Sequence, residues 1–290
     1  MQKIKIISSE PEARFKTYLN PFHLVMRLNR YKQLLWQFIW WEVNDRYRGS
    51  ALGILWTIIV PLLRLSVYTF VFSILLGGRN IIWGLDSNFA VGKMIFCGVV
   101  MFSVFSETVG KASRLMWINK SYVKNIAFPL AIIPVTLTGV AVVQSVIGMG
   151  VLLVLELFSS GSLHWTLIYL PLVYLPLIFF VTGISWILAT VGVFSRDINN
   201  LMQSLIQLLF FLSGVIFPLD RLLAMVPDKW AWVLRINIIS SVIDDARRVV
   251  FEGQGPDWFW LKIDLLFTMI LLIIGYACFM SYKRDFADAI

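Results

Sequence analysis

Long stretches without a charged residue recur along this sequence and set the first limit on its fold. The segments 126–155 and 163–195 contain no Asp, Glu, Lys or Arg. An apolar stretch of about 18 residues or more is long enough to cross the hydrocarbon core of a bilayer as a helix. Because only 14% of the 290 residues are charged and 59% are hydrophobic, an ordinary soluble domain is excluded. We therefore expect an all-α integral membrane protein.

Six transmembrane helices are predicted from these apolar windows. They lie at about residues 51–76, 89–110, 126–155, 163–195, 198–219 and 265–282. The first window is interrupted by Pro61 and Arg64, and the second has Lys93 and Glu107 near its ends. Glu156 and the small polar residues after it form the expected turn between the third and fourth windows. The six-span domain is predicted to cover residues 49–290.

The residues before the first window are polar and then amphipathic. Residues 1–20 are predicted to form a polar cytoplasmic tail, and residues 21–48 an N-terminal amphipathic helix in the membrane interface. Its apolar side chains recur at helical spacing, at Leu24, Leu28, Tyr31, Leu35 and Phe38. Because the first window begins only after Arg48, it comes too late in the chain for a cleavable signal peptide.

The basic residues favour one orientation of the six helices. Residues 1–50 hold nine Lys or Arg, the loop after the second window adds four, and the tail adds Lys283 and Arg284. Short loops rich in Lys and Arg stay on the cytoplasmic side. We therefore expect a multi-pass protein of the bacterial inner (plasma) membrane with both termini in the cytoplasm. The net charge of +8 is then explained by the membrane, and no nucleic-acid partner is predicted.

The segment between the fifth and sixth windows has mixed charge and is predicted to contain re-entrant outer helices. Within it, residues 236–251 show one apolar face and one charged face. The charged face comprises Asp244, Asp245, Arg247 and Arg248, and we interpret it as a solvated helix face. Residues 220–255 are expected to fold back into the outer side of the membrane and gate the exit, with Asp244, Asp245, Arg247 and Arg248 as the candidate gate residues. The alternative is a plain pair of outer helices packed on the domain.

Several kinds of chemistry lack their usual residues. The interiors of the predicted third to sixth spans contain no ionisable residue, whereas transporters driven by an ion gradient usually need one. No phosphate-binding Gly-x-x-x-x-Gly-Lys-Ser/Thr motif occurs, so ATP hydrolysis is expected in another chain. His23 and His164 are isolated, and Cys97 and Cys278 lie inside apolar windows. We predict no catalytic residues, no metal site and no cofactor in this chain.

One string is specific enough to indicate a family. Residues 45–61, DRYRGSALGILWTIIVP, resemble the opening of permease subunits of type 2 ABC exporters for O-antigen, teichoic acid and capsule polymers. Further matches follow in the same order along the chain, at residues 121–134, 194–197, 213–218 and 286–288. One departure is Ile238 after Asn237, where the family often has a proline.

The resemblance implies a homodimer of six-span subunits that encloses a channel. A separate nucleotide-binding ATPase subunit would bind ATP and Mg²⁺, and membrane lipids would surround the complex. The implied function is ATP-driven export of an undecaprenyl-linked, O-antigen-like polysaccharide from cytoplasm to periplasm. Two alternatives stay open: an ABC-2 permease for a small lipid or drug, and a membrane-bound glycosyl- or acyltransferase.

Three basic residues are candidates for substrate or lipid-phosphate binding. Arg46 and Arg48 lie where the interface helix meets the first span, and a guanidinium matches phosphate geometry. The alternative for both is ordinary anchoring on the cytoplasmic side. Arg64 lies near the middle of the first window, where a charge should face protein or water rather than lipid.

Two further sets of side chains are assigned to glycan and to the ATPase. Aromatic planes stack on sugar rings, and the candidates for the glycan path are Tyr68, Phe72, Trp83, Phe102 and Phe105. Their alternative is a lipid-facing position that needs no ligand. The candidates for ATPase coupling are Lys111, Arg114, Lys120, Lys124, Arg196 and Asp197, with a solvated basic loop as the alternative for the first four.

Overall fold

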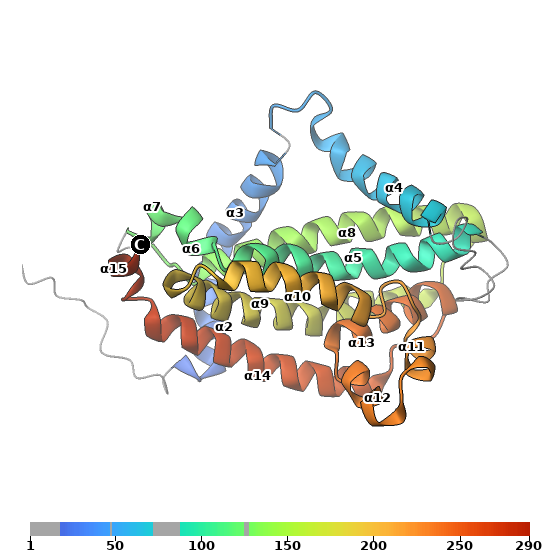
Figure 1. Ribbon diagram of the computed structural model, residues 1–290. Helices are drawn as coiled ribbons and strands as arrows, with labels where there is room; N and C mark the ends of the chain where they lie inside the picture. The colour runs from blue at the N-terminus through green and yellow to red at the C-terminus, as the bar shows by residue number, and fades with distance from the viewer. Residues whose placement is uncertain (1–17, 47, 72–87, 125–127) are drawn as a thin grey trace, which may run out of the picture.

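A computed structural model of the chain describes residues 18–46, 48–71, 88–124 and 128–290, and every regular element in these ranges is a helix (Figure 1). The helices are α2 (Pro21–Arg30), α3 (Lys32–Asp45), α4 (Trp56–Tyr68), α5 (Asn88–Ala112), α6 (Leu115–Ile118), α7 (Lys120–Val123), α8 (Ile132–Ser160), α9 (Leu170–Phe194), α10 (Ile198–Leu212), α11 (Leu219–Met225), α12 (Asp228–Arg235), α13 (Ile238–Arg247), α14 (Trp258–Tyr282) and α15 (Phe286–Ala289). The all-α prediction is confirmed for this part of the chain.

The long helices form a bundle with two distinct ends (Figure 1). Helices α6, α7 and α15 lie at one end, called here the α6 end, and α11, α12 and α13 lie at the other, called the α13 end. Helix α5 contacts α4, α8, α9, α10 and α13, so it forms the centre of the bundle. Helix α4 leans away from the bundle and joins α3 at a turn that projects outward.

Four of the described helices are long and apolar enough to cross a membrane. They are Phe89–Ala112, Ile132–Ser160, Trp165–Phe194 and Trp258–Tyr282. The apolar helices Trp56–Val71 and Ile198–Leu212 are shorter. At a rise of 1.5 Å per residue, each of these two spans only about 22–24 Å. The structure therefore supports a membrane-embedded chain, and the count of six spans stays a prediction.

Helix α14 begins earlier than the sequence predicted. The window was expected at 265–282, but the helix begins at Trp258, where the Asp257 carboxylate accepts hydrogen bonds from the N–H groups of Phe259 and Trp260. Asp264 therefore lies inside the helix, where it is buried. The expectation that the later spans contain no ionisable residue is wrong at this position, because the capping carboxylate starts the helix before the apolar run.

The predicted interface helix at 21–48 is broken into two. Helix α2 begins after Asn20, whose side chain accepts a hydrogen bond from the Phe22 N–H, and it ends at Arg30. Helix α3 then packs across α8, and α2 contacts α14. The break lies at Tyr31, which belongs to neither helix. The N-terminal region thus wraps one side of the bundle in two pieces.

Two glycines allow α9 and α14 to pack closely. A Cβ added at Gly275 would clash with the main-chain oxygen of Gly183, and one added at Gly183 would lie 2.9 Å from the oxygen of Leu271. Helix association in a membrane depends on close packing of this kind, since water supplies no hydrophobic driving force there. We infer that this contact fixes α14, the last long helix, against the core.

A buried ion pair joins α5 and α8 near the α13 end. The Lys93 ammonium lies 2.6 Å from a Glu156 carboxylate oxygen and 2.6 Å from the Ser159 hydroxyl oxygen. Both charged residues are only 8% exposed. Glu156 was predicted to lie in a turn, but α8 continues to Ser160 and Glu156 is buried within it. Since each charge is compensated by the other, the pair holds the two helix ends together.

Candidate functional site

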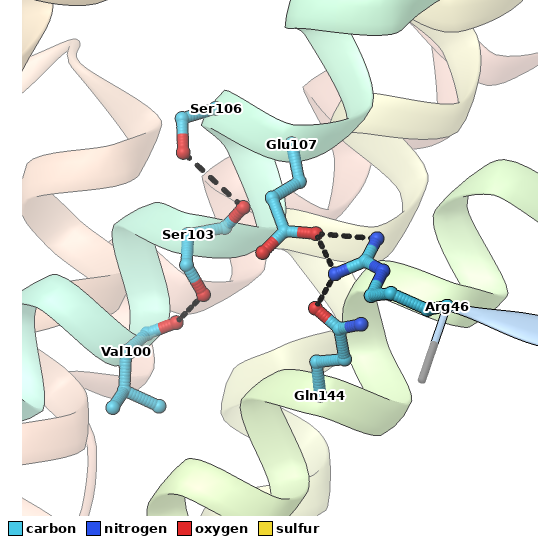
Figure 2. Close-up of polar contacts among 6 residues, drawn as sticks. All are labelled: Arg46, Val100, Ser103, Ser106, Glu107 and Gln144. Atoms are coloured by element: carbon cyan, nitrogen blue, oxygen red, sulfur yellow. Dashed lines mark hydrogen bonds and ion pairs between the residues drawn. The ribbon is translucent and has the colours of Figure 1, made fainter. Parts of the chain in front are cut away.

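A three-residue polar cluster joins the N-terminal helices to the bundle. Arg46 follows α3, Glu107 lies in α5 and Gln144 lies in α8 (Figure 2). Both terminal nitrogens of the Arg46 guanidinium lie 3.2 Å from the same oxygen of Glu107. One of them also donates to the side-chain oxygen of Gln144. Because hydrogen bonds between ionised groups are among the stronger ones in proteins, this cluster fixes the end of α3 against two helices of the bundle.

A small cavity of about 100 Å³ adjoins this cluster, between α4, α5 and α8. Its polar lining residues are Arg46, Thr57, Arg64, Ser103, Glu107, Gln144 and Ser145. The Ser103 and Ser106 hydroxyls already donate within α5, to the carbonyls of Val100 and Ser103 (Figure 2). The charged groups at the cavity are two guanidiniums, of Arg46 and Arg64, and one carboxylate, of Glu107. Their positive net charge favours an anionic ligand.

A larger open cavity of about 480 Å³ continues from the small one, between α4, α5 and α10. Arg64, Val99 and Ser103 line both cavities. The larger one is also lined by Tyr68, Phe102, Ser106, Ile206, Gln207, Phe210 and Phe211. We call the two cavities together the α4–α10 groove. It combines a guanidinium with aromatic faces and neutral polar groups, and these could hold a phosphate and sugar rings respectively.

The three predicted phosphate-binding residues have different positions. Arg46 and Arg64 line the same cavity, as the hypothesis requires. Arg46 is held by Glu107 and Gln144, whereas exposed Arg64 makes no ion pair with any described residue. Arg48 lines neither cavity; its side chain is 81% exposed and lies 3.9 Å from Asp45. Arg64 is thus the accessible guanidinium of the small cavity. Arg46 lines the same cavity, but its guanidinium is held by Glu107 and Gln144.

The predicted aromatic path is only partly assembled at the groove. Tyr68 and Phe102 line it, and Phe102 packs edge-on against Phe210, with 5.3 Å between ring centroids. Phe105 lines neither cavity and instead stacks on Phe180 in the core. Phe72 and Trp83 lie outside the described residues. Phe210 and Phe211 were not predicted to line the groove, although both lie in the apolar fifth window.

The predicted coupling residues lie toward the α6 end, but they do not form one group. Arg114 and Arg196 line a separate cavity there, which also includes Trp117. The three lysines of this set are exposed and do not line the cavity. They are Lys111, Lys120 and Lys124. Asp197 is also exposed and lies directly before α10.

The charged run in α13 is not a solvated helix face, and this prediction was wrong. Asp245 is 2% exposed and Arg247 is 3% exposed, because this side of α13 packs against α5 and α9. An Asp245 oxygen accepts the Asp257 N–H at 2.7 Å, and burial raises the pKa of Asp245 to about 7. Asp244 and Arg248 are only partly buried. The proline that often follows Asn237 in the similar permeases is Ile238 here. The Asn237 side chain caps α13 by accepting a hydrogen bond from the Ile239 N–H.

The Arg247 guanidinium is bound by main-chain oxygens from two other segments. It donates to the Met94 carbonyl of α5 at 3.0 Å, and to the carbonyls of Gly214 and Val215 after α10 at 2.7 and 2.6 Å. A guanidinium has five N–H donors in a fixed plane, which suits several acceptors at once. Arg247 therefore fixes the outer helices to the centre of the bundle rather than facing solvent.

Within the described residues, no group of three His, Cys, Asp or Glu could hold a metal ion.

Comparison with known proteins identifies relatives along most of the chain. The profile of the family described as ABC-2 type transporter matches residues 33–251. The chain is 27% identical over 269 residues to the O-antigen export system permease protein RfbA of Myxococcus xanthus, which covers 92% of this chain and 99% of the relative. It is 25% identical to the Klebsiella pneumoniae protein of the same name, over 85% and 91% of the two chains. It is also 24% identical to the polysialic acid transport protein KpsM of Escherichia coli, over 84% and 91%.

Proposed function

The chain belongs to the ABC-2 type transporter family, and on that premise we propose that it is the channel-forming permease subunit of an ATP-driven polysaccharide exporter. The substrate would be an undecaprenyl-linked, O-antigen-like glycan that moves from the cytoplasm to the periplasm. The observation that carries this proposal is the similarity to O-antigen permeases over nearly the whole length of both chains. The groove supports it, since a guanidinium suited to phosphate and aromatic side chains suited to sugar rings line the same groove.

The proposed assembly contains two copies of this chain and two ATPase subunits. Exposed apolar side chains of α4 and α10, two of the helices that line the groove, support a second copy. Leu63 and Val67 of α4 are 55% and 57% exposed, and Leu208 and Phe211 of α10 are 59% and 60% exposed. A second copy facing this side would cover these residues and turn two grooves into one enclosed channel. Membrane lipids would cover the rest.

Energy would come from the separate ATPase subunit, which would bind ATP and Mg²⁺. The sequence has no phosphate-cradling motif of its own. The distribution of Lys and Arg supports an inner-membrane location with both termini in the cytoplasm, because the first 50 residues and the tail are basic. The α6 end, where the C-terminal helix α15 lies, would then face the cytoplasm and the ATPase.

A deletion strain tests this function in cells. Without the gene, cells that still make the glycan should lose it from their surface and accumulate it, linked to lipid, on the cytoplasmic side. The wild-type gene should restore surface glycan only when the partner ATPase can hydrolyse ATP. The measurement is surface labelling with a glycan-specific antibody, together with extraction of the lipid-linked pool. Normal surface glycan in the deletion strain, with loss of export of a small lipid or drug, would instead favour the alternative permease function.

A further inference from the structure

A cavity of about 420 Å³ lies at the α6 end and is separate from the α4–α10 groove. Ser113 and Arg114 line it from the turn after α5, Trp117 from α6, Arg196 from the turn between α9 and α10, and Asn199 from the start of α10. Two turns that are far apart in the sequence therefore form the walls of one cavity.

The cationic side of this cavity is held in place by an aromatic ring. The Arg196 guanidinium lies 4.8 Å from the centroid of the Trp117 ring, a favourable cation–π distance. The indole N–H of Trp117 donates to the Gly192 carbonyl at 3.1 Å, which fixes the ring itself. On the buried side, the Ser113 hydroxyl donates to the side-chain oxygen of Asn199 at 3.3 Å and joins the two turns. The cavity is thus preorganised before any ligand binds.

The charge of the cavity favours an anion, and a carboxylate is one that fits. Arg114 and Arg196 both line it and are both exposed, and none of the described lining residues is Asp or Glu. Two guanidiniums without an opposing carboxylate attract an anion, and a planar carboxylate matches the guanidinium plane in a bidentate pair. A volume of about 420 Å³ is larger than one Asp or Glu side chain needs and can admit the backbone that carries it.

We propose that this cavity is a socket for an acidic side chain, Asp or Glu, presented by the ATPase subunit. This inference rests on the proposed function, because it names the chemistry by which the partner would be recognised. A protein partner fits better than a lipid, since Arg114 and Arg196 lie in turns beyond the ends of α5 and α9 rather than on the lipid-facing sides of the helices. One bound side chain would contact both turns and move them together.

Charge reversal inside and outside the socket tests the proposal. The chain is co-expressed with its ATPase subunit and purified through a tag on the permease, and the ATPase recovered per permease is measured. The double variant Arg114→Glu/Arg196→Glu should recover at least about tenfold less ATPase than wild type, because it removes both attractive charges and repels the acid. The double variant Lys229→Glu/Arg235→Glu makes the same change in net charge at two exposed residues of α12, at the opposite end of the bundle, and it should stay within about twofold of wild type.

The outcomes separate this inference from the proposed function. Equal recovery of the ATPase with both double variants would overturn the socket and leave the transporter assignment standing. Recovery of no ATPase by the wild type would overturn both. A second measurement does not depend on charge reversal: a photo-crosslinker at the exposed position Ile118, which lines the cavity, should capture an ATPase segment that contains Asp or Glu. Capture of lipid, of a second permease copy or of an ATPase segment without an acid would contradict the proposal.

Discussion

Replacement of Arg64 with alanine is expected to lower ATP-driven export of the lipid-linked glycan at least about tenfold without reducing the amount of folded permease. Arg64 is the accessible guanidinium shared by both cavities of the groove. A hydrogen bond to a charged group contributes about 1.5–3 kcal/mol, and 1.4 kcal/mol corresponds to about tenfold in an equilibrium constant. Folding should be unaffected, because Arg64 makes no ion pair with any described residue that its removal would break.

Two further variants give this prediction its controls. Arg64→Lys keeps the charge but loses the planar pair of donors, so export should lie between wild type and Arg64→Ala. Arg48→Ala removes an exposed guanidinium that lines neither cavity, and export should stay within about twofold of wild type. The measurement is surface glycan per folded permease in the complemented deletion strain. Equal losses in Arg64→Ala and Arg48→Ala would show general anchoring on the membrane rather than a binding site in the groove.

Replacement of Arg247 with alanine should destabilise the protein by about 3 kcal/mol. The substitution removes the donor from three main-chain carbonyls, those of Met94, Gly214 and Val215, and leaves them without this partner. It also opens a cavity between α13 and α5. The free energy of unfolding of the purified protein in detergent, measured with increasing denaturant, should fall by this amount.

A substitution at a neighbouring glycine tests the same contact independently, and a substitution at an exposed arginine is the control. A Cβ at Gly98 would lie 2.8 Å from an Arg247 side-chain nitrogen and 2.9 Å from the Val215 oxygen. Gly98→Ala should therefore destabilise by about 1–3 kcal/mol, because it pushes apart the same segments. Arg235 of α12 is exposed, and Arg235→Ala should change stability by less than about 0.5 kcal/mol. A small effect at both Arg247 and Gly98 would contradict the structural role of this buried guanidinium.

The parts of the fold that could be predicted are those that depend on composition within one helix. Uncharged windows located α8 and α9, and the second window closely matches α5, because hydropathy depends on a single segment. The start of α14 was misplaced because Asp264 and Lys262 interrupted the apolar run. The Asp257 cap, eight residues before the start of the window, was a local signal that could have corrected it.

The parts of the site that could not be predicted depend on contacts between distant segments. Arg46 and Arg64 were identified from residue type and position, but Glu107 and Gln144 become partners of Arg46 only through the packing of α5 and α8 against α3. The burial of Arg247 was missed for a different reason. Its acceptors are main-chain carbonyls, and any residue type can supply these, so the sequence carries no pattern for them.

Reconstitution of the permease with its ATPase in lipid vesicles tests the central claim, that this chain forms half of an ATP-driven export channel. ATP is supplied outside, and the lipid-linked glycan is incorporated into the same membrane. The measurement is how much glycan becomes inaccessible to a glycan-cleaving enzyme added outside. The account predicts ATP-dependent protection of the glycan, together with faster ATP hydrolysis when the glycolipid is present. ATP hydrolysis that does not respond to the glycolipid, with no protected glycan, would contradict it.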